Sequence, residues 1–482
     1  MKNVLLTIVT FLFCFNIPIY SQEGTLDQTF GNNGFFKINS PDGFYGSCNE
    51  IVVDPSNNIF SIGKSYMEVN DNYEQIVVKL LQDGNPDATF GVNGIVILPS
   101  NFGTLNKIDV QDDGKIVISS NLDNTLNIIR LNLDGSFDSS FSNDGVFTIS
   151  GNTWTFSRSI LLYDNQIFIG GKVSNNSVIF KLDQNGILDS TFGTNGFFYL
   201  SSASRDIALQ VDNQGMLYCA YSEPAGNDTL VLLTKINTQG ELDITFGSNG
   251  SIGLYEIYGG GYGELKIINN SLYLFVGWSG EAGGFKGLFA KTNLNGTPDA
   301  SFGNNGIYGH SYRSYSFLVQ NDNKILSGGF QQWDDGPGLF RLDAYGEFDN
   351  SFGNNGMIEG ILTSFYDFKF QGSENFLIGG ATSNITNISY AISRYSILNP
   401  DLSINQNSLE DFKIYPNPIE TVFKIYSDRI IEQIKIYDIS GKHIRNYNKT
   451  DSYNISNFKS GLYLLKVKFV DGSIVFKKIV KK

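Results

Sequence analysis

Short apolar runs separated by turn-forming residues fill most of the chain. In one stretch, apolar residues gather at 95–98, 108–112, 115–119 and 126–133, and Asp113-Gly114 stands between two of these runs. Runs of this length, bounded by Gly, Asn and Asp, are typical of β-strands. No segment keeps a helical period long enough to compete. The pattern therefore predicts four short strands in this stretch and an all-β chain.

One motif, Asp-x-Thr/Ser-Phe-Gly-x-Asn-Gly, recurs at intervals of 50 to 60 residues, with a looser third copy that has Ser142 and Asp144 in place of Gly and Asn. A fixed period of this size indicates stacked supersecondary units. Four strands in each unit are typical of a β-propeller, and seven strand sets lie between Phe35 and Arg394. We expect a seven-bladed β-propeller. The seven copies begin at Asp27, Asp87, Asp138, Asp189, Asp243, Asp299 and Asp349.

Each position of the motif suits a scaffold. The aspartate can accept local hydrogen bonds from the Thr or Ser two places on, and the glycines allow left-handed backbone. The phenylalanine ring can insert between neighbouring units and bury a large apolar area. Seven equivalent aspartates lack the asymmetry that a catalytic pair needs, so we interpret them as structural. The seven phenylalanines are Phe30, Phe90, Phe141, Phe192, Phe246, Phe302 and Phe352.

The ends of the repeat array are offset from each other. The first motif precedes any strand set, whereas the last set, which ends in Tyr390–Leu398, has no motif after it. In a closed ring the N-terminal copy supplies what the last blade lacks. We therefore expect the first and last units to join, with an open β-solenoid as the alternative.

The two ends of the chain differ from the repeats. Residues 1–21, with Lys2 before an apolar run of sixteen residues, are typical of a signal peptide and too short for a confident membrane span. We assign the propeller to 22–398 and a polar linker to 399–410. Several short strands without helices in 411–482 predict a small Ig-like β-sandwich.

Charge supports a boundary near residue 400. Residues 408–482 carry 14 Lys and Arg against 8 Asp and Glu, while the rest of the chain carries 20 against 40. The acidic body argues against nucleic acid as a partner, because phosphate contacts need clustered cations. No later stretch matches the apolarity of the first, so we expect no transmembrane segment in the mature chain. Cys48 and Cys219 fall in units one and four, too far apart for a disulfide.

The repeat units resemble the delta-60 repeat family over roughly residues 24–398, on the pattern Leu-Asp-x-Thr-Phe-Gly-x-Asn-Gly. The function of that family is unsettled. The resemblance therefore implies a propeller-like body and names no ligand.

The C-terminal segment resembles the type A sorting domain of the type IX secretion system. Four motifs match in order: YPNP at 415–418, IKIYDISGKHI at 434–444, SGLYLLKV at 460–467 and KKIVKK at 477–482. The resemblance implies that the type IX machinery is a partner and that the protein is exported, then secreted or anchored on the outer cell surface. The residues that carry it include Tyr415, Pro416, Asn417, Pro418, Gly441, Lys442, Gly461, Leu462, Tyr463, Lys477 and Lys478.

Few residues are available for catalysis or metal binding. The chain has two histidines, His310 and His443, which is too few for a His-based metal cluster. A Ser-His-Asp triad could use only His310. We interpret His310 as structural. No phosphate-loop spacing occurs, and the turn at 183–186 lacks the distal Glu of an EF-hand. We predict no metal site and no cofactor. A carboxylate pair for glycoside hydrolysis stays open.

The loops that vary between units lie on one face of the predicted propeller and are rich in aromatic residues. Function is expected on that face, because the loops vary while the turns repeat. Exposed rings can stack on sugars or anchor protein partners, and blade packing is the alternative for each ring. The candidate ligand-binding residues are Tyr66, Tyr73, Trp154, Trp278, Phe285, Tyr312, Trp333, Asp334 and Asp335.

Three functions are consistent with this sequence. We favour an exported, non-catalytic binding or adhesion module with a glycan or a surface protein as its ligand. The alternatives are a carbohydrate-active enzyme, a hydrolase or lyase, on a propeller scaffold, and a structural component of a surface layer.

Overall fold

The structure is a computed structural model that describes residues 24–397 and 412–482 except for short gaps. The gaps are 42–43, 68–70, 152, 154, 175, 201–204, 227, 259–260, 280–284, 311, 332–336, 354–355, 360–361, 363, 384–386, 428–429, 439–442, 449, 451 and 471–473. The predicted signal peptide and linker lie outside the described residues. The chain forms two compact units, one of which is Ser21–Leu398 and the other of which contains Asn399–Lys482.

Both units are built from β-strands. The described residues contain one short 3-10 turn at Ser100–Phe102 and no α-helix. Within this part of the chain, no helix is long and apolar enough to span a membrane. The all-β prediction is confirmed.

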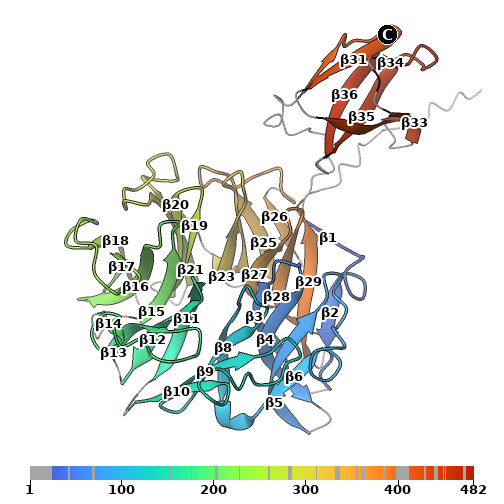
Figure 1. Cartoon of the computed structure of the whole chain (residues 1–482). Coiled ribbons are helices and arrows are strands. Elements are labelled where there is room, and N and C mark those ends of the chain that lie inside the picture. The colour runs from blue at the N-terminus through green and yellow to red at the C-terminus, as the bar shows by residue number, and fades with distance from the viewer. Residues whose placement is uncertain are drawn as a thin grey trace, which may run out of the picture. The chain divides into compact units, whose positions relative to one another are not determined.

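The first unit is a ring of seven antiparallel sheets, or blades, as Figure 1 shows. Six blades are continuous in the sequence, and strands that follow one another in the chain pair with one another. Blades 1 to 3 consist of β3 (Ser47–Val53), β4 (Ile59–Met67), β5 (Asn72–Leu80) and β6 (Ile95–Leu98); β7 (Thr104–Val110), β8 (Ile116–Leu122), β9 (Thr125–Leu131) and β10 (Val146–Ser150); and β11 (Phe156–Tyr163), β12 (Gln166–Val173), β13 (Asn176–Leu182) and β14 (Phe197–Tyr199). Blades 4 to 6 consist of β15 (Arg205–Val211), β16 (Leu217–Ala225), β17 (Asp228–Ile236) and β18 (Ser251–Tyr258); β19 (Gly261–Ile268), β20 (Ser271–Ser279), β21 (Phe285–Asn293) and β22 (Ile307–His310); and β23 (Tyr312–Val319), β24 (Ile325–Gln331), β25 (Pro337–Leu342) and β26 (Met357–Glu359).

The seventh blade joins the two ends of the propeller sequence. Strands β27 (Ser364–Gln371), β28 (Asn375–Ser383) and β29 (Ile388–Ser396) come from the C-terminal side. The N-terminal strands β2 (Phe35–Ile38) and β1 (Thr25–Leu26) both pair with β29. The predicted joining of first and last units is therefore confirmed, and the ring is closed by backbone hydrogen bonds.

The first strand of each blade lies nearest the axis. Strands β3, β7, β11, β15, β19, β23 and β27 adjoin one another around the ring. The outer strands β6, β10, β14, β18, β22, β26 and β2 lie at the far edges of their sheets. This order places seven inner strands around one channel.

The motif phenylalanines lie at the interfaces between blades. Phe90, for example, is fully buried with Phe60 and Val77 of blade 1 and Ile116 and Ile129 of blade 2. Each of the seven rings is at most 3% exposed and belongs to a different apolar cluster, and each cluster spans two adjacent blades. Burying a Phe side chain contributes about 1.5–3 kcal/mol.

Each motif aspartate also pairs with a cation, which in six of the seven cases lies eight residues earlier in the same blade. This partner was not predicted from the sequence. The final pair crosses the ring closure, because Arg394 of β29 donates from Nε to Asp27 at 2.8 Å. The other six pairs are Lys79–Asp87, Arg130–Asp138, Lys181–Asp189, Lys235–Asp243, Lys291–Asp299 and Arg341–Asp349.

The second oxygen of each aspartate closes the local turn. Asp87 Oδ1 accepts from the backbone N–H and the hydroxyl of Thr89, at 2.9 and 2.6 Å. Partial burial raises the pKa of Asp87, but the hydrogen bonds from Lys79 and Thr89 outweigh burial and lower the pKa to about 2. Several of the cations reach the next blade as well: Lys181 Nζ donates to the carbonyl of Thr238 at 3.1 Å. The motif therefore links each blade to its neighbour.

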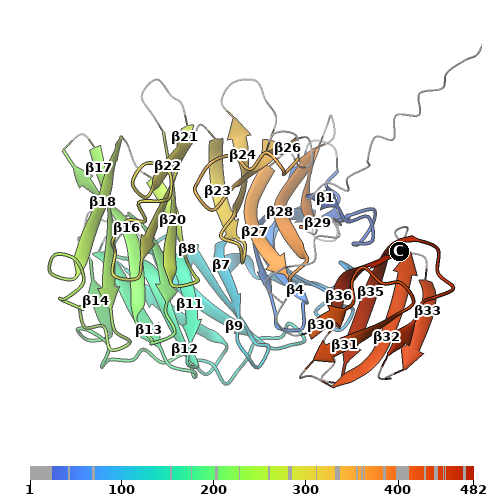
Figure 2. The same cartoon turned by 90° about the horizontal axis from the view of Figure 1, so that it is seen from above.

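The C-terminal unit has two sheets that face each other across an apolar core, and Figure 2 shows its strands. One sheet contains β30 (Phe412–Tyr415), β31 (Val422–Ser427) and β34 (Tyr453–Asn454), and the other β33 (His443–Asn448), β32 (Ile431–Asp438), β35 (Gly461–Phe469) and β36 (Ile474–Lys481). The core joins Phe423 and Tyr453 from the first sheet with Ile434, Leu465 and Val467 from the second. The predicted small β-sandwich is confirmed.

The ion pairs of the motif allow a direct test of the scaffold. Asp138 accepts hydrogen bonds from Arg130 at 2.7 Å and Lys115 at 2.9 Å, and the Arg130 side chain is 5% exposed. Burial raises the pKa of Asp138, but Ser140, Lys115 and Arg130 hold it well below its usual range. Asp138→Asn would leave a buried guanidinium without its counterion. We expect a loss of roughly 3–5 kcal/mol in the free energy of unfolding at pH 7, measured by denaturant titration.

Asp243→Asn is the matched control. Its partner Lys235 lies 3.2 Å away with 18% of the side chain exposed, so the expected loss is about 1 kcal/mol or less. The stability that the Asp138 carboxylate contributes is present above the ordinary pKa of Asp and disappears as pH falls through the lowered pKa. The difference in the free energy of unfolding between the native protein and Asp138→Asn should therefore become smaller in acid. Equal losses in the two variants would contradict this account.

Candidate functional site

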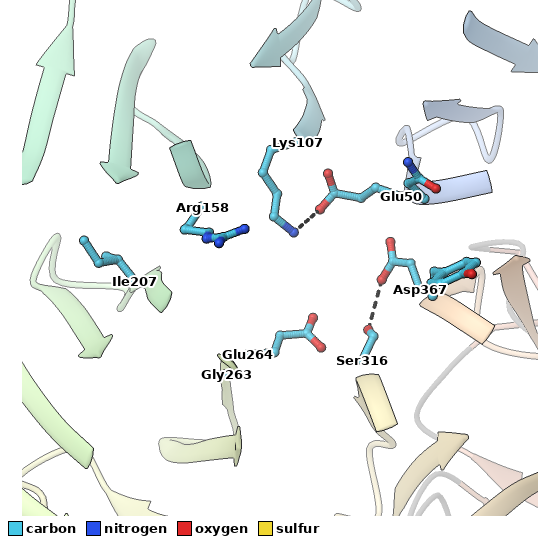
Figure 3. Close-up of a pocket in the computed structure, with 10 residues that line it drawn as sticks. Glu50, Lys107, Arg158, Ile207, Gly263, Glu264, Ser316 and Asp367 are labelled. Atoms are coloured by element: carbon cyan, nitrogen blue, oxygen red, sulfur yellow. Dashed lines mark hydrogen bonds and ion pairs between the residues drawn. The ribbon is translucent and has the colours of Figure 1, made fainter. Parts of the chain in front are cut away.

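The inner strands of all seven blades line a pocket of about 200 Å³ on the propeller axis. Equivalent positions of the seven strands lie at one level, so each blade contributes at least one residue. In Figure 3, the labelled polar side chains extend from their separate strands toward a shared centre. The residues at this level are Glu50, Lys107, Arg158, Ile207, Glu264, Ser316 and Asp367, and Asn49, Gly263 and Tyr366 beside them complete the described lining.

A β-bulge interrupts six of the seven inner strands near this level. The shift in β3, for instance, lies between Cys48 and Glu50, and that in β7 between Leu105 and Lys107. Bulges re-aim side chains and leave backbone groups without a partner in the ladder. They account for the turn of Glu50 and Lys107 toward the axis.

Carboxylates from one blade accept backbone N–H groups of the next blade. Asp367 accepts from Ile51 at 2.9 Å, and Glu50 accepts from Ile108 at 2.7 Å. Glu264 repeats the arrangement on the opposite side of the ring by accepting from Phe317 at 3.0 Å. These carboxylates therefore tie neighbouring blades together.

The same three carboxylates pair with lysines. Lys107 Nζ lies 2.7 Å from Glu50, and Lys266 Nζ lies 2.7 Å from Glu264. Lys369 lies 2.8 Å from Asp367, and its charge lowers the pKa of Asp367 although burial raises it. Burial raises the pKa of Glu50, against the opposing effect of Lys107.

Asp109 lies two residues beyond Lys107 on β7. Its Oδ1 accepts from the backbone N–H of Val110 at 2.9 Å. Burial, with a further contribution from the charge of Glu50, raises the pKa of Asp109 to about 6. Asp109 therefore holds a proton more readily than an ordinary aspartate.

A second, larger cleft of about 630 Å³ lies at the junction of blades 2 and 3. It adjoins the axial pocket, because Arg158 of β11 lines both. The Arg158 side chain is exposed, and its guanidinium carbon lies 4.7 Å from the centre of the Phe156 ring. The other lining residues are Asn106, Asn121, Asp123, Asn124 and Thr155.

Two predicted site residues, Tyr66 and Tyr73, form an aromatic cluster on blade 1. They are paired across β4 and β5, with ring centres 5.7 Å apart. Phe44 stacks on Tyr66 at 3.9 Å, and Tyr45 lies 4.8 Å from Tyr73. Tyr66 is only 9% exposed, so its ring contributes to packing of the blade.

The remaining predicted site residues are spread around the ring. Trp278 and Phe285 lie near the adjacent ends of β20 and β21 in blade 5, and Tyr312 begins β23 in blade 6. Tyr66 and Tyr73 are not among the described residues that line the axial pocket or the cleft. Trp154, Trp333, Asp334 and Asp335 lie outside the described residues.

The sequence analysis did not predict the polar residues that line the pocket and the cleft. The available signal was a charge in the middle of the first strand of several units, as in Glu50, Lys107 and Asp367. Repeat alignment at single-residue level would have found it, since these strands are otherwise mainly apolar.

Three residues for which no function was predicted, His310, Cys48 and Cys219, are buried. His310 packs against the rings of Phe275 and Phe289, and burial lowers the pKa of the imidazole to about 3. Cys48 and Cys219 are both free thiols, as expected. Among the described residues, no group of His, Cys, Asp and Glu side chains could hold a metal ion.

The motifs of the C-terminal unit meet at its last strand. Asn417 accepts from the backbone N–H of Val480 at 2.8 Å and donates to the carbonyl of Lys478 at 3.2 Å. Lys477 and Lys478 pair with Leu465 and Leu464 across β36 and β35. The YPNP turn is thus attached to the basic C-terminal strand. Gly441 and Lys442 lie outside the described residues, while Gly461, Leu462 and Tyr463 begin β35.

Solved structures with related architecture are remote in sequence. An extracellular domain from B. thetaiotaomicron, described as part of a hybrid two-component system, is 13% identical, with a TM-score of 0.42 over 96% of this chain and 59% of that one. The β-propeller domain of the Trilobed protease from Pyrococcus furiosus is 9% identical, with a TM-score of 0.43 over 76% of this chain and 99% of that one. Pyrococcus horikoshii acylaminoacyl peptidase is 10% identical, with a TM-score of 0.40 over 89% and 59%.

Family comparisons match both units. No curated protein matches this sequence. Residues 111–141 match a β-propeller family described as a domain of unknown function, DUF5122, and residues 413–482 match the secretion system C-terminal sorting domain. The C-terminal unit is therefore a type IX sorting domain that follows a β-propeller in the sequence. The chain is an exported protein that is attached to, or released from, the outer cell surface.

Proposed function

We propose that this protein is a non-catalytic binding or adhesion module, displayed outside the cell, whose ligand binds on the propeller face near the axis. The observation that carries the proposal is the contrast between the two hollows. The carboxylates of the axial pocket are engaged in bonds between blades, whereas the adjoining cleft is about three times larger and is lined by the side chains of Asn106, Asn121 and Asn124.

The engaged carboxylates argue against glycoside hydrolysis at the axis. A glycosidase needs one carboxyl group that donates a proton and a second that acts as base or nucleophile. Glu50, Glu264 and Asp367 each accept a backbone N–H and pair with a lysine at 2.7–2.8 Å. If one of these carboxylates took part in catalysis, it would have to give up a hydrogen bond that joins two blades.

The sorting domain supports an extracellular ligand. Its partner is the type IX secretion machinery, which acts before the propeller meets its ligand. A glycan or a protein of another surface is therefore the class of ligand that the propeller can reach.

One observation favours the carbohydrate-active enzyme as a second candidate. Burial raises the pKa of Asp109 to about 6, a value that suits a general acid near neutral pH, although Asp109 is not among the described residues that line the axial pocket or the cleft. The purified protein should be incubated with a glycan array and a panel of polysaccharides. Saturable binding without product is the expected result. Released oligosaccharides would favour the enzyme instead, and neither binding nor product would favour a structural surface-layer component.

Asp109→Asn separates the two candidates further. Because the pKa of Asp109 is raised above its usual value of 3.8, ionisation destabilises the folded state as pH rises from about 4 to above 6. The variant should be more stable than native protein at pH 8, by up to about 3 kcal/mol at 1.36 kcal/mol per pKa unit, and nearly equal at pH 4. Thermal unfolding at both pH values measures this, and ligand binding should be unchanged. Loss of a glycan-cleaving activity in the variant would establish the enzyme.

A further inference from the structure

The walls of the cleft between blades 2 and 3 are fixed by hydrogen bonds and burial. Asn106 of β7 donates to Asn121 Oδ1 of β8 at 2.7 Å, which orients both amide groups. Thr155, immediately before β11, lines the cleft and is only 1% exposed. The hydroxyl oxygens of Ser119 and Ser157 lie 2.5 Å apart and join the two blades. The walls are therefore in place before a ligand arrives, which lowers the entropic cost of binding.

The turn between β8 and β9 supplies two more lining residues, Asp123 and Asn124. Asp123 has left-handed backbone, with a φ of 52°, and both side chains are exposed. The carbonyl of Asn124 accepts from the backbone N–H of Gly151 at 2.9 Å, which attaches the turn to the segment that leads into blade 3. The turn therefore holds the Asp123 carboxylate at the cleft.

Several polar groups of this lining have no hydrogen-bond partner within the part of the chain that the structure describes. They are the side-chain oxygen of Asn106, the Nδ2 donors of Asn121, the carboxylate of Asp123 and the side-chain amide of Asn124. The cleft thus presents donors and acceptors together. Its volume of about 630 Å³ falls within the range of about 300–1,000 Å³ typical of small-molecule sites.

The Asp123 carboxylate and the Asn121 donors together limit the class of ligand. A carboxylate or sulfate group offers only acceptors, and the charge of Asp123 repels it. An ammonium group offers only donors and leaves the N–H groups of Asn121 without an acceptor. A hydroxyl group donates to a carboxylate and accepts from an amide at the same time. Neutral ligands rich in hydroxyl groups therefore match the lining best.

We propose that this cleft binds a neutral sugar unit of an oligosaccharide or polysaccharide. Neighbouring hydroxyl groups of the sugar donate to Asp123 and accept from Asn121, and Asn106 and Asn124 bind the hydroxyl groups beside them. This inference rests on the proposed binding function, to which it adds a site and a ligand class.

The test compares oligosaccharides that share a backbone and differ in charge. Cellohexaose is titrated into the full protein by calorimetry, alongside the glucuronate and glucosamine hexamers of the same linkage. Mannohexaose is titrated alongside the mannuronate hexamer. At least one neutral hexamer should bind at least about tenfold more tightly than each of its charged counterparts.

Two variants of the cleft and one matched control complete the design. Asp123→Asn keeps a residue type that tolerates left-handed backbone and removes the charge. It should bind the neutral hexamer about tenfold more weakly and should lose most of the discrimination against the acidic hexamer, with an unchanged melting temperature. Asn121→Ala should also weaken binding of the neutral hexamer by about tenfold.

Asp164→Asn is the control. Asp164 is an exposed residue of another Asp-Asn turn, between β11 and β12, with a φ of 50°, and it is not among the described residues that line the cleft. This variant should bind the neutral hexamer with unchanged affinity.

Two kinds of result would overturn the inference, and they are distinguishable. If the charged hexamers bind as tightly as the neutral ones, or if Asp123→Asn keeps the full preference for the neutral form, the neutral-sugar site is refuted. Binding of another glycan or of a surface protein would then leave the proposed binding function standing. Absence of binding to every glycan and surface protein refutes both.

Discussion

The structure depends on one repeated contact, the pairing of a cation on the third strand of a blade with the aspartate of the turn that follows it. The aspartate is held between that cation and its own turn, and the phenylalanine three residues later fills the interface to the next blade. At the seventh position the two partners, Arg394 and Asp27, come from opposite ends of the propeller sequence. The same contact that orders each blade therefore also closes the ring.

Closure of the ring determines which side chains meet at the propeller axis. Seven inner strands are brought to one level, and bulges in β3 and β7 turn Glu50 and Lys107 inward. Most of those groups then bond across blades, as Glu50 does to Ile108 and Asp367 does to Ile51. The axial charges are thus largely part of the scaffold. The adjoining cleft is lined by polar side chains of blades 2 and 3, among them Asn106, Asn121 and Asp123.

Much of the architecture could be predicted because it repeats. The number of repeated strand sets predicted the number of blades, and the unmatched first copy of the motif predicted the closure. The aspartate partners were also visible, since a Lys or Arg stands eight residues before the motif in six units and at Arg394 in the last. They were missed because lysines on strands are common and their pairing depends on the turn geometry.

The candidate site was less predictable. Aromatic residues in the variable loops stand out in the sequence, but Tyr66 is buried against Phe44. The cleft residues come from β7, β8 and β11, and no property of Asn106 or Arg158 alone marks them. Their meeting depends on the registers of three strands and on the bulge in β11 between Ser157 and Ser159.

Ring closure can be measured most directly by cysteine cross-linking. Thr25 and Ser396 face each other in the β1–β29 register, where Cα atoms of antiparallel neighbours lie about 4.5–5.5 Å apart, within reach of a disulfide. A T25C/S396C variant should oxidise as readily as T125C/S150C, a pair from the β9–β10 register within blade 2. Both bonds should fail to form in denaturant. A closed ring requires the first disulfide in the folded protein, and formation of the T125C/S150C bond without the T25C/S396C bond would contradict it.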